Sequence, residues 1–224
     1  ARERIASIAH VTPLDRAHAL GNLVGCELYL KAENLQRTGS FKIRGAANKL
    51  AVLSQEEKAR GVIAASAGNH AQGVALAARE SGVAATVVMP RDTPFAKVAA
   101  TINYGAQVIL EGHSFDDAMV RARALAKDRD LTLVHAYDDP DIIAGQGTVG
   151  LEIVGALPEV DVVVVPVGGG GLLAGVALAI KEYLPRTRVI GVQTVASPAW
   201  ARSFREKGLI DVPATFTMAD GIAV

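Results

Sequence analysis

Residues 162–180, VVVVPVGGGGLLAGVALAI, hold the pattern that decides the fold. The segment starts with a short apolar run rich in valine, which is typical of a buried strand, and four consecutive glycines follow. Leucine, alanine and valine then recur at helical spacing. A strand that passes through glycines into a helix is the repeating unit of an α/β fold with a parallel sheet. Because the valines are uninterrupted, we expect helices to cover both faces of this strand.

Similar apolar runs alternate with helical patterns along the rest of the chain. The other predicted strands are 61–66, 84–89, 107–110, 131–135 and 188–193. The other predicted helices are 69–81, 94–105 and 114–128, and the segment 141–157 follows them before the valine run. We therefore expect an α/β protein of two lobes, each an open, mostly parallel sheet flanked by helices. The last ten residues, TFTMADGIAV, are largely apolar and have no polar tail, so we expect the C-terminal part of the second lobe to be missing.

The composition excludes several classes of protein. Lys plus Arg and Asp plus Glu number 23 each in 224 residues, without a basic block, so no nucleic-acid partner is expected. The single cysteine, Cys26, excludes an intrachain disulfide, and the five histidines lack the spacing of metal ligands. The chain has no apolar run of 18 residues, and its first ten residues do not resemble a signal peptide. We expect a cytoplasmic protein that has no membrane partner and no metal.

The four glycines, Gly168 to Gly171, predict an anion site, because a helix that starts directly after them offers unpaired N–H groups and the positive end of its dipole. Gly169, Gly171 and Ala174 also fit the dinucleotide pattern G-x-G-x-x-G/A. That site needs an acidic residue about 20 positions later, where this chain has Gln193. A dinucleotide-binding oxidoreductase is therefore a weak alternative, but it stays open at this point.

A second loop, SAGNH (66–70), also joins a predicted strand to a predicted helix. Ser66, Asn69 and the backbone N–H groups could hold a carboxylate there. Ordinary capping of the helix by Ser66 or Asn69 explains the same residues equally well. His70 alone is more typical of a packed helix residue than of a base.

Lys42, in RTGSFKIRG (37–45), lies between the apolar residues Phe41 and Ile43. A surface lysine at the start of a helix is the simplest interpretation, since lysine is seldom buried without a compensating group. Two possible anion-binding loops on the same chain favour a different interpretation of Lys42. An enzyme that uses pyridoxal 5'-phosphate needs a reactive lysine, a phosphate cradle and a site for the substrate carboxylate. Desolvation would lower the pKa of Lys42 and make its amine a nucleophile and a base.

Four segments in order carry a family resemblance: KAENLQRTGSFKIRGA, SAGNHAQGVA, AGQGTVGLEI and PVGGGGLLAGVA. Together they resemble the fold type II pyridoxal phosphate enzymes (the tryptophan synthase β-like fold), and within these most closely the threonine dehydratases. The resemblance runs from about Thr12 to Val224. It implies a large cofactor-binding domain made of residues 1–46 and 139–224, and a small substrate-loop domain of residues 47–138.

The resemblance also implies the roles of single residues. Lys42 is the lysine that forms the Schiff base with the cofactor, Phe41 packs beside the cofactor, and Asn69 bonds the cofactor's phenolic oxygen. The implied substrate-carboxylate loop is Ser66, Ala67, Gly68, Asn69 and His70, and the implied phosphate cradle is Gly168, Gly169, Gly170, Gly171 and Leu172.

The implied reaction is α,β-elimination of an amino acid substrate, which turns L-threonine into 2-oxobutanoate and ammonia, and L-serine into pyruvate. The implied assembly is a homo-oligomer, either a dimer or a tetramer. Serine racemases share the scaffold but carry a serine at the second loop position, where this chain has Ala67, so dehydration is favoured. Relatives that bind a divalent cation use a glutamate at the position of Gln193, so no metal is expected. A truncated or regulatory relative that keeps the fold without turnover is the third hypothesis.

Overall fold

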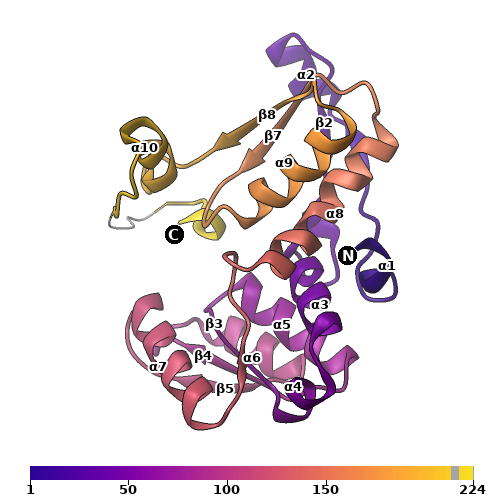
Figure 1. The fold of residues 1–224 in the computed structure, drawn as a ribbon. Helices are drawn as coiled ribbons and strands as arrows, with labels where there is room; N and C mark the ends of the chain where they lie inside the picture. The colour runs from indigo at the N-terminus through magenta and orange to yellow at the C-terminus, as the bar shows by residue number, and fades with distance from the viewer. Residues whose placement is uncertain (213–216, 224) are drawn as a thin grey trace.

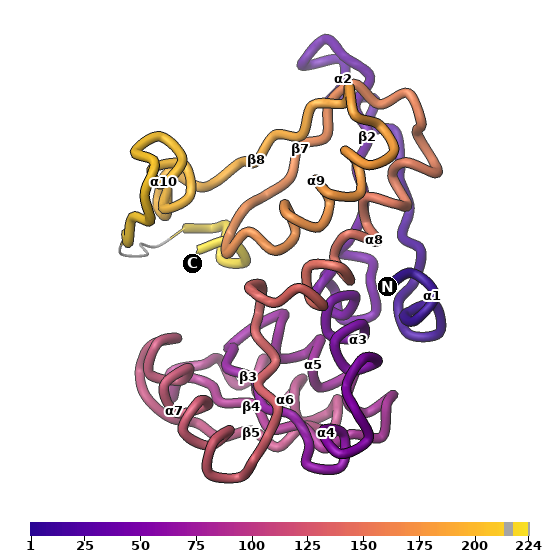
Figure 2. The backbone as a smooth tube through the Cα atoms, in the orientation of Figure 1, coloured from indigo at the N-terminus to yellow at the C-terminus, as the bar shows by residue number. Residues whose placement is uncertain are grey.

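The computed structural model describes residues 1–212 and 217–223, which form two lobes joined along helices α3 (Lys42–Val52) and α8 (Pro140–Ala156) (Figures 1 and 2). The lower lobe holds a four-stranded sheet in the order β5-β4-β3-β6, in which all neighbours are parallel. Its strands are β3 (Val62–Ala65), β4 (Ala85–Met89), β5 (Gln107–Leu110) and β6 (Thr132–Leu133). Its helices are α4 (Gln55–Arg60), α5 (Asn69–Glu80), α6 (Phe95–Asn103) and α7 (Phe115–Asp128).

The upper lobe is built on β7 (Val162–Pro166) and β8 (Arg188–Val192), a parallel pair. Its helices are α8 (Pro140–Ala156), α9 (Gly171–Tyr183) and α10 (Ala199–Glu206), and a 3-10 turn, η2 (Asp220–Ile222), lies near the end of the chain. The N-terminal part contributes α1 (Arg2–Ile5), β1 (Leu14–Arg16), α2 (His18–Val24), β2 (Tyr29–Lys31), η1 (Glu33–Leu35) and α3 (Lys42–Val52). Strands β1 and β2 pair antiparallel and, with α2, form the arm at the top of Figure 1.

The predicted strands and helices of both lobes are confirmed, and so is the parallel α/β class. In the lower lobe, alternate residues of β3 face opposite helices. Val62 and Ala64 join the core that contains residues of α3 and α5, whereas Ile63 and Ala65 pack with residues of α7. This sheet is therefore covered on both faces, as its apolar strands require.

The expectation that the valine run is covered on both faces is wrong for the part of the chain that the structure describes. Val163 and Val165 pack against α8 and α9, but Val162 and Val164 are 39% and 60% exposed. The strand has only one neighbour among the described residues, β8, and only one of its faces is packed by helices. The domain boundary expected between residues 46 and 47 lies within α3.

Among the residues that the structure describes, no helix is long and apolar enough to cross a membrane.

Glycines let helix α8 pack closely against α3 and α9 where the lobes meet. A Cβ on Gly145 would lie 2.5 Å from the Cα of Gly45 and 2.8 Å from the carbonyl carbon of Arg44. A Cβ on Gly147 would lie 3.0 Å from the carbonyl oxygen of Gly175. Backbone atoms cannot yield as a flexible side chain can, so these helices approach to a distance that only glycine allows.

Replacing Gly145 by alanine is expected to lower the free energy of unfolding by about 2 kcal/mol or more, because overpacking a tight contact forces the helices apart. The matched control is Gly155→Ala in the same helix, where the new Cβ meets no atom within 4 Å. There we expect a neutral effect or a gain of up to about 1 kcal/mol from helix propensity. Urea unfolding followed by circular dichroism measures both variants, and equal effects at the two positions would contradict the packing argument.

Candidate active site

Lys42 is the first residue of α3, and its side chain lies partly buried between the two lobes. Its Nζ donates a hydrogen bond to the carbonyl oxygen of Ala136 at 2.8 Å and lies 5.4 Å from the centre of the Phe41 ring. Burial lowers the pKa of the amine from 10.5 to about 8, because the charged form loses its hydration. Lys42 is thus an amine that changes its protonation state near physiological pH.

The loop 66–70 lies close to this amine because α5 packs tightly on the start of α3. A Cβ on Gly73, in the second turn of α5, would lie 3.0 Å from the carbonyl carbon of Lys42. Helix α5 starts at Asn69 with Gly68 as its N-cap, and no side chain caps it. The alternative of capping by Ser66 or Asn69 is therefore wrong. The Ser66 hydroxyl instead accepts the N–H of Gly68 at 3.1 Å, within the loop itself.

His70 lies with its ring inside the lower lobe. It is 3% exposed, and its Nε2 lies 3.0 Å from the carbonyl oxygen of Val134, which can only accept a hydrogen bond. Nε2 therefore carries the hydrogen. Burial, and secondarily the charge of Lys42, lower the pKa of His70 to about 3, so the ring is neutral at physiological pH. Its side chain is a packed anchor, in agreement with the simpler interpretation of the sequence.

The four-glycine loop joins β7 to α9 at the carboxyl end of the strand. Gly170 has φ of 90°, a left-handed conformation that favours glycine, and it is the N-cap of α9. No side chain among the described residues caps α9. Its first N–H groups, from Gly171 and Leu172 onward, are therefore available to bind a ligand. The loop therefore has the geometry of a phosphate site at a helix N-terminus.

Residues 134–137 connect these three parts. The carbonyl of Val134 accepts from His70, the carbonyl of Ala136 accepts from Lys42, and Tyr137 packs against Gly169 and Gly171. In Figure 2 the chain passes from the lower lobe to the upper one just before α8, which begins at Pro140. One short segment, residues 134–137, thus contacts residues at or near the starts of α3, α5 and α9. The sequence had singled out residues at each of these three helix starts.

Ala136 and Tyr137, which contact Lys42 and the glycine loop, were not predicted from the sequence. A backbone carbonyl carries no residue signature, so Ala136 could not be identified by its type. One signal was available, because HAY (135–137) directly follows a predicted strand. Ligands of open α/β sheets bind at the carboxyl ends of strands, so the sequence already places residues 135–137 at a possible ligand site.

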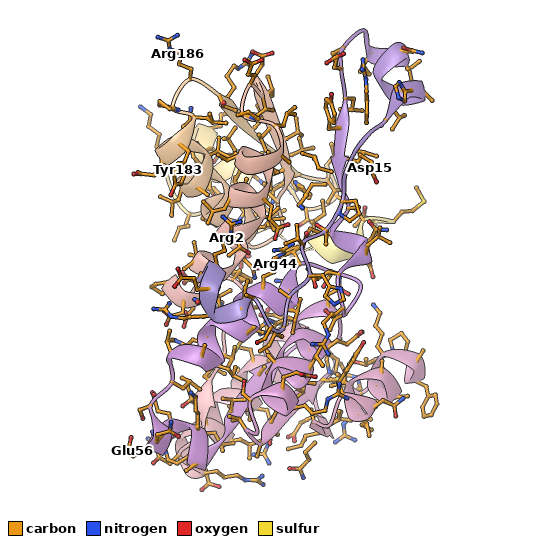
Figure 3. The ribbon with its side chains drawn as sticks, turned by 90° about the vertical axis from the view of Figure 1, so that its right-hand side faces the viewer. Arg2, Asp15, Arg44, Glu56, Tyr183 and Arg186 are labelled. Atoms are coloured by element: carbon orange, nitrogen blue, oxygen red, sulfur yellow. The ribbon has the colours of Figure 1, made fainter. Side chains whose placement is uncertain are left out.

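A buried ionic cluster fixes α3 close to Lys42. Arg44 is 1% exposed and donates to Glu33 at 2.8 Å and to Glu152 at 2.5 Å, while Lys31 pairs with Glu152 at 2.6 Å. Arg44 also donates to the Thr148 hydroxyl at 3.2 Å. Figure 3 shows Arg44 in the middle of the molecule, whereas Glu56 and Arg186 lie at its two ends. The cluster ties α3, η1, β2 and α8 together, with its two acidic and two basic side chains balancing in charge.

These residues fit pyridoxal phosphate. The α9 start can receive the phosphate, and Lys42 supplies an amine whose only side-chain hydrogen bond, among the described residues, is to a backbone carbonyl. Asn69 lies at the α5 start, where a Cβ on Gly221 of the C-terminal turn would come within 4.0 Å of its Nδ2. Gln193, where the resemblance would place a glutamate in a cation-binding protein, accepts the N–H of Ala201 with its side-chain oxygen.

The chain matches the family model of the pyridoxal-phosphate dependent enzymes over residues 5–224. The chain belongs to this family. Membership in the pyridoxal-phosphate dependent enzymes identifies the cofactor that the glycine loop and Lys42 fit, and it leaves the dinucleotide alternative without support. The expected α/β fold of fold type II is likewise confirmed.

Individual members of the family are similar over almost the whole chain. An L-threonine ammonia-lyase of Thermotoga maritima is 54% identical over all 224 residues, which make up 56% of that relative. The structure of processed threonine deaminase isoform 2 from Solanum lycopersicum has a TM-score of 0.95 and 43% identity, covering 98% of this chain and 61% of that one. Maize serine racemase has a TM-score of 0.96 and 37% identity, covering 99% and 68%. The chain thus spans little more than half the length of the Thermotoga relative.

Capture of pyridoxal phosphate by this protein is expected to accelerate with pH and to level off above about pH 8. Only a neutral amine can attack the cofactor's aldehyde. With the pKa of Lys42 lowered to about 8, the neutral fraction rises about tenfold per pH unit below that value and little above it. Stopped-flow absorbance at several pH values measures the rate. A midpoint near the ordinary lysine pKa of 10.5 would contradict the site described here.

Proposed function

We propose that this protein is a pyridoxal phosphate-dependent L-threonine ammonia-lyase, which converts L-threonine to 2-oxobutanoate and ammonia, and L-serine to pyruvate. The observation that carries the proposal is the desolvated Lys42 amine, held beside the starts of α5 and α9 through residues 134–137. The Thermotoga maritima relative, named L-threonine ammonia-lyase, supports the choice of reaction.

The residues of this chain have separate tasks in the reaction. N–H groups at the start of α5, with Asn69, bind the substrate carboxylate, and those at the start of α9 bind the cofactor phosphate. When bound, pyridoxal phosphate supplies the electron sink that takes up the charge left on Cα. Lys42 removes the proton from Cα, and its pKa of about 8 suits proton exchange near neutral pH. The proton that Lys42 takes from Cα balances the departing β-hydroxyl, which leaves as water, and the released enamine hydrolyses to the 2-oxo acid and ammonia.

A serine racemase is the second candidate, because maize serine racemase shares the fold closely. Racemisation requires one base to remove the Cα proton and a second group on the opposite face to return it. The loop position at which the racemases carry a serine is Ala67 here, and a methyl group cannot transfer a proton. This difference supports elimination over racemisation.

Several further expectations belong to the same proposal. We propose a cytoplasmic homo-oligomer, a dimer or a tetramer, with no metal in the catalytic site. We also keep the division into a cofactor-binding part, residues 1–46 and 139–224, and a substrate-loop part, residues 47–138. The four-stranded sheet falls wholly within the second of these ranges, which supports the division.

The test incubates the purified protein with pyridoxal phosphate and, separately, with L-threonine, L-serine and the D-enantiomers. Ammonia and 2-oxo acid are measured together with the enantiomeric composition of the remaining amino acid. We expect equal amounts of ammonia and 2-oxobutanoate from L-threonine, without accumulation of D-serine from L-serine. Formation of D-serine without ammonia would favour the racemase. Cofactor binding without any turnover of these amino acids would favour a truncated or regulatory relative that keeps the fold and lacks this activity.

A further inference from the structure

We propose that Tyr137 is a positioning residue of the phosphate cradle, which holds the four-glycine loop in the conformation that receives the cofactor phosphate. This inference rests on the proposed function, since it concerns the same site. It assigns a role in cofactor binding to a residue outside the glycine loop, on the segment that crosses between the lobes.

Tyr137 contacts the four-glycine loop at two positions. The Tyr137 ring occupies the space into which a side chain at position 169 would project, with its Cε1 2.5 Å from the place of that Cβ. The backbone of Tyr137 does the same at Gly171, where its carbonyl oxygen and Cα would lie 2.8 and 3.0 Å from an added Cβ. The loop therefore packs against Tyr137 at two of its four glycines, Gly169 and Gly171.

Tyr137 is itself held in place by the residues on either side of it. The neighbouring His135 accepts the N–H of Asp138 at 2.9 Å with its Nδ1, and its ring meets the Tyr137 ring edge to face at 4.7 Å between centroids. One residue further on, Asp139 caps α8 by accepting the N–H of Asp141 at 2.8 Å. A segment held at both ends is a rigid support, whereas a run of glycines has no rigidity of its own.

The glycine loop also contacts a second aromatic side chain, that of Trp200. A Cβ on Gly170 would lie 3.3 Å from Cζ2 of Trp200, at the start of α10. The glycines thus run between two aromatic side chains, one from the lobe crossing and one from α10. Removal of the Tyr137 ring would leave Gly169 without its support and allow the N–H groups at the start of α9 to turn away from the phosphate.

The experiment compares two ligands, pyridoxal phosphate and pyridoxal, which differ only in the phosphate. Dissociation constants are measured by absorbance for the unaltered protein and for Tyr137→Phe and Tyr137→Ala, with circular dichroism as the check on folding. We expect Tyr137→Ala to weaken pyridoxal phosphate binding by roughly tenfold or more, the scale of a misaligned anion site at a helix N-terminus, and to leave pyridoxal binding nearly unchanged. Tyr137→Phe keeps the ring and should bind both ligands like the unaltered protein. If Tyr137→Ala does not fold, Tyr137→Leu takes its place.

A steric rescue provides the second arm. Gly169→Ala should also weaken pyridoxal phosphate binding, because its methyl group enters the space of the Tyr137 ring, and adding Tyr137→Ala to it should restore part of the affinity. Unchanged affinity in Tyr137→Ala, equal losses for both ligands, or a double variant worse than both single ones would overturn the proposal. Failure of the unaltered protein to bind pyridoxal phosphate is a different result, which would overturn the proposed function as well.

Discussion

Replacing Lys42 by methionine is expected to abolish the release of ammonia from L-threonine and, at the same time, to stabilise the cofactor-free protein. Activity is lost because no other described amine takes the place of Lys42 beside Ala136. Lys42→Ala should lose activity in the same way. Full activity in either variant would contradict the assignment of Lys42 as the reactive lysine.

The gain in stability follows from the lowered pKa of Lys42, about 8 in the folded protein against 10.5 ordinarily. Between these values the unfolded chain binds more protons than the folded one, so the charged lysine opposes folding below pH 8 and ceases to do so as the pH approaches 10.5. Methionine fills a similar volume without a charge, and it should raise the free energy of unfolding at pH 7 by up to about 3 kcal/mol. Active-site residues often cost stability in this way.

Urea unfolding at pH 7 and at pH 10 tests the stability effect without added cofactor. The gain from Lys42→Met should be largest at pH 7 and should shrink at pH 10. The matched control is Lys127→Met, at an exposed position near the end of α7, where we expect a change within about 0.5 kcal/mol at both pH values. A destabilised Lys42→Met protein at pH 7 would show that the lysine is not desolvated as described.

Replacing Arg44 by alanine is expected to cost the protein about 3–5 kcal/mol of folding free energy, as measured for broken buried ion pairs. The guanidinium is 1% exposed and bonds Glu33, Glu152 and the Thr148 hydroxyl. Without it, two largely buried carboxylates would share the single charge of Lys31. A loss of this size would unfold many domains, so the cluster should be essential for the junction of the two lobes.

The control for Arg44 is Arg202→Ala, which removes an exposed pair with Glu206 one turn along α10. Such surface pairs contribute about 0.3–0.5 kcal/mol. Urea unfolding at pH 7 compares the two variants. If Arg44→Ala cost less than about 1 kcal/mol, the cluster would not be the anchor that its burial and hydrogen bonds indicate.

The sequence predicted most of the strands and helices of the two lobes, because apolar runs and helical spacing are local signals. It also selected the residues at the starts of α3, α5 and α9 that the fold brings to one junction. The arm made of β1, α2 and β2 was not predicted, since its strands have only three residues each and carry little periodicity. The valine run correctly predicted a strand, but it did not predict that Val164 is exposed. That exposure depends on which helices and strands pack beside the strand, and the valine run alone does not specify them.

The cluster around Arg44 could not be predicted for a different reason. Its partners come from residues 11 to 108 positions away in the sequence, and nothing about an arginine in a helix distinguishes a buried one from a solvated one. The same applies to the carbonyl of Ala136, which lies 94 positions from Lys42. Both interactions can be recognised only in the folded protein, where residues 134–137 and α8 lie against α3.

The most direct measurement of the central claim is a mapping of the lysine that bonds the cofactor. The protein is mixed with one equivalent of pyridoxal phosphate at pH 8 and reduced with borohydride, and its proteolytic peptides are analysed by mass spectrometry. We predict that the modification lies on Lys42, in the peptide that contains TGSFKIR, and that it is absent from Lys42→Met. Modification concentrated on any other lysine, or spread over the surface lysines with Lys42 unlabelled, would contradict the account.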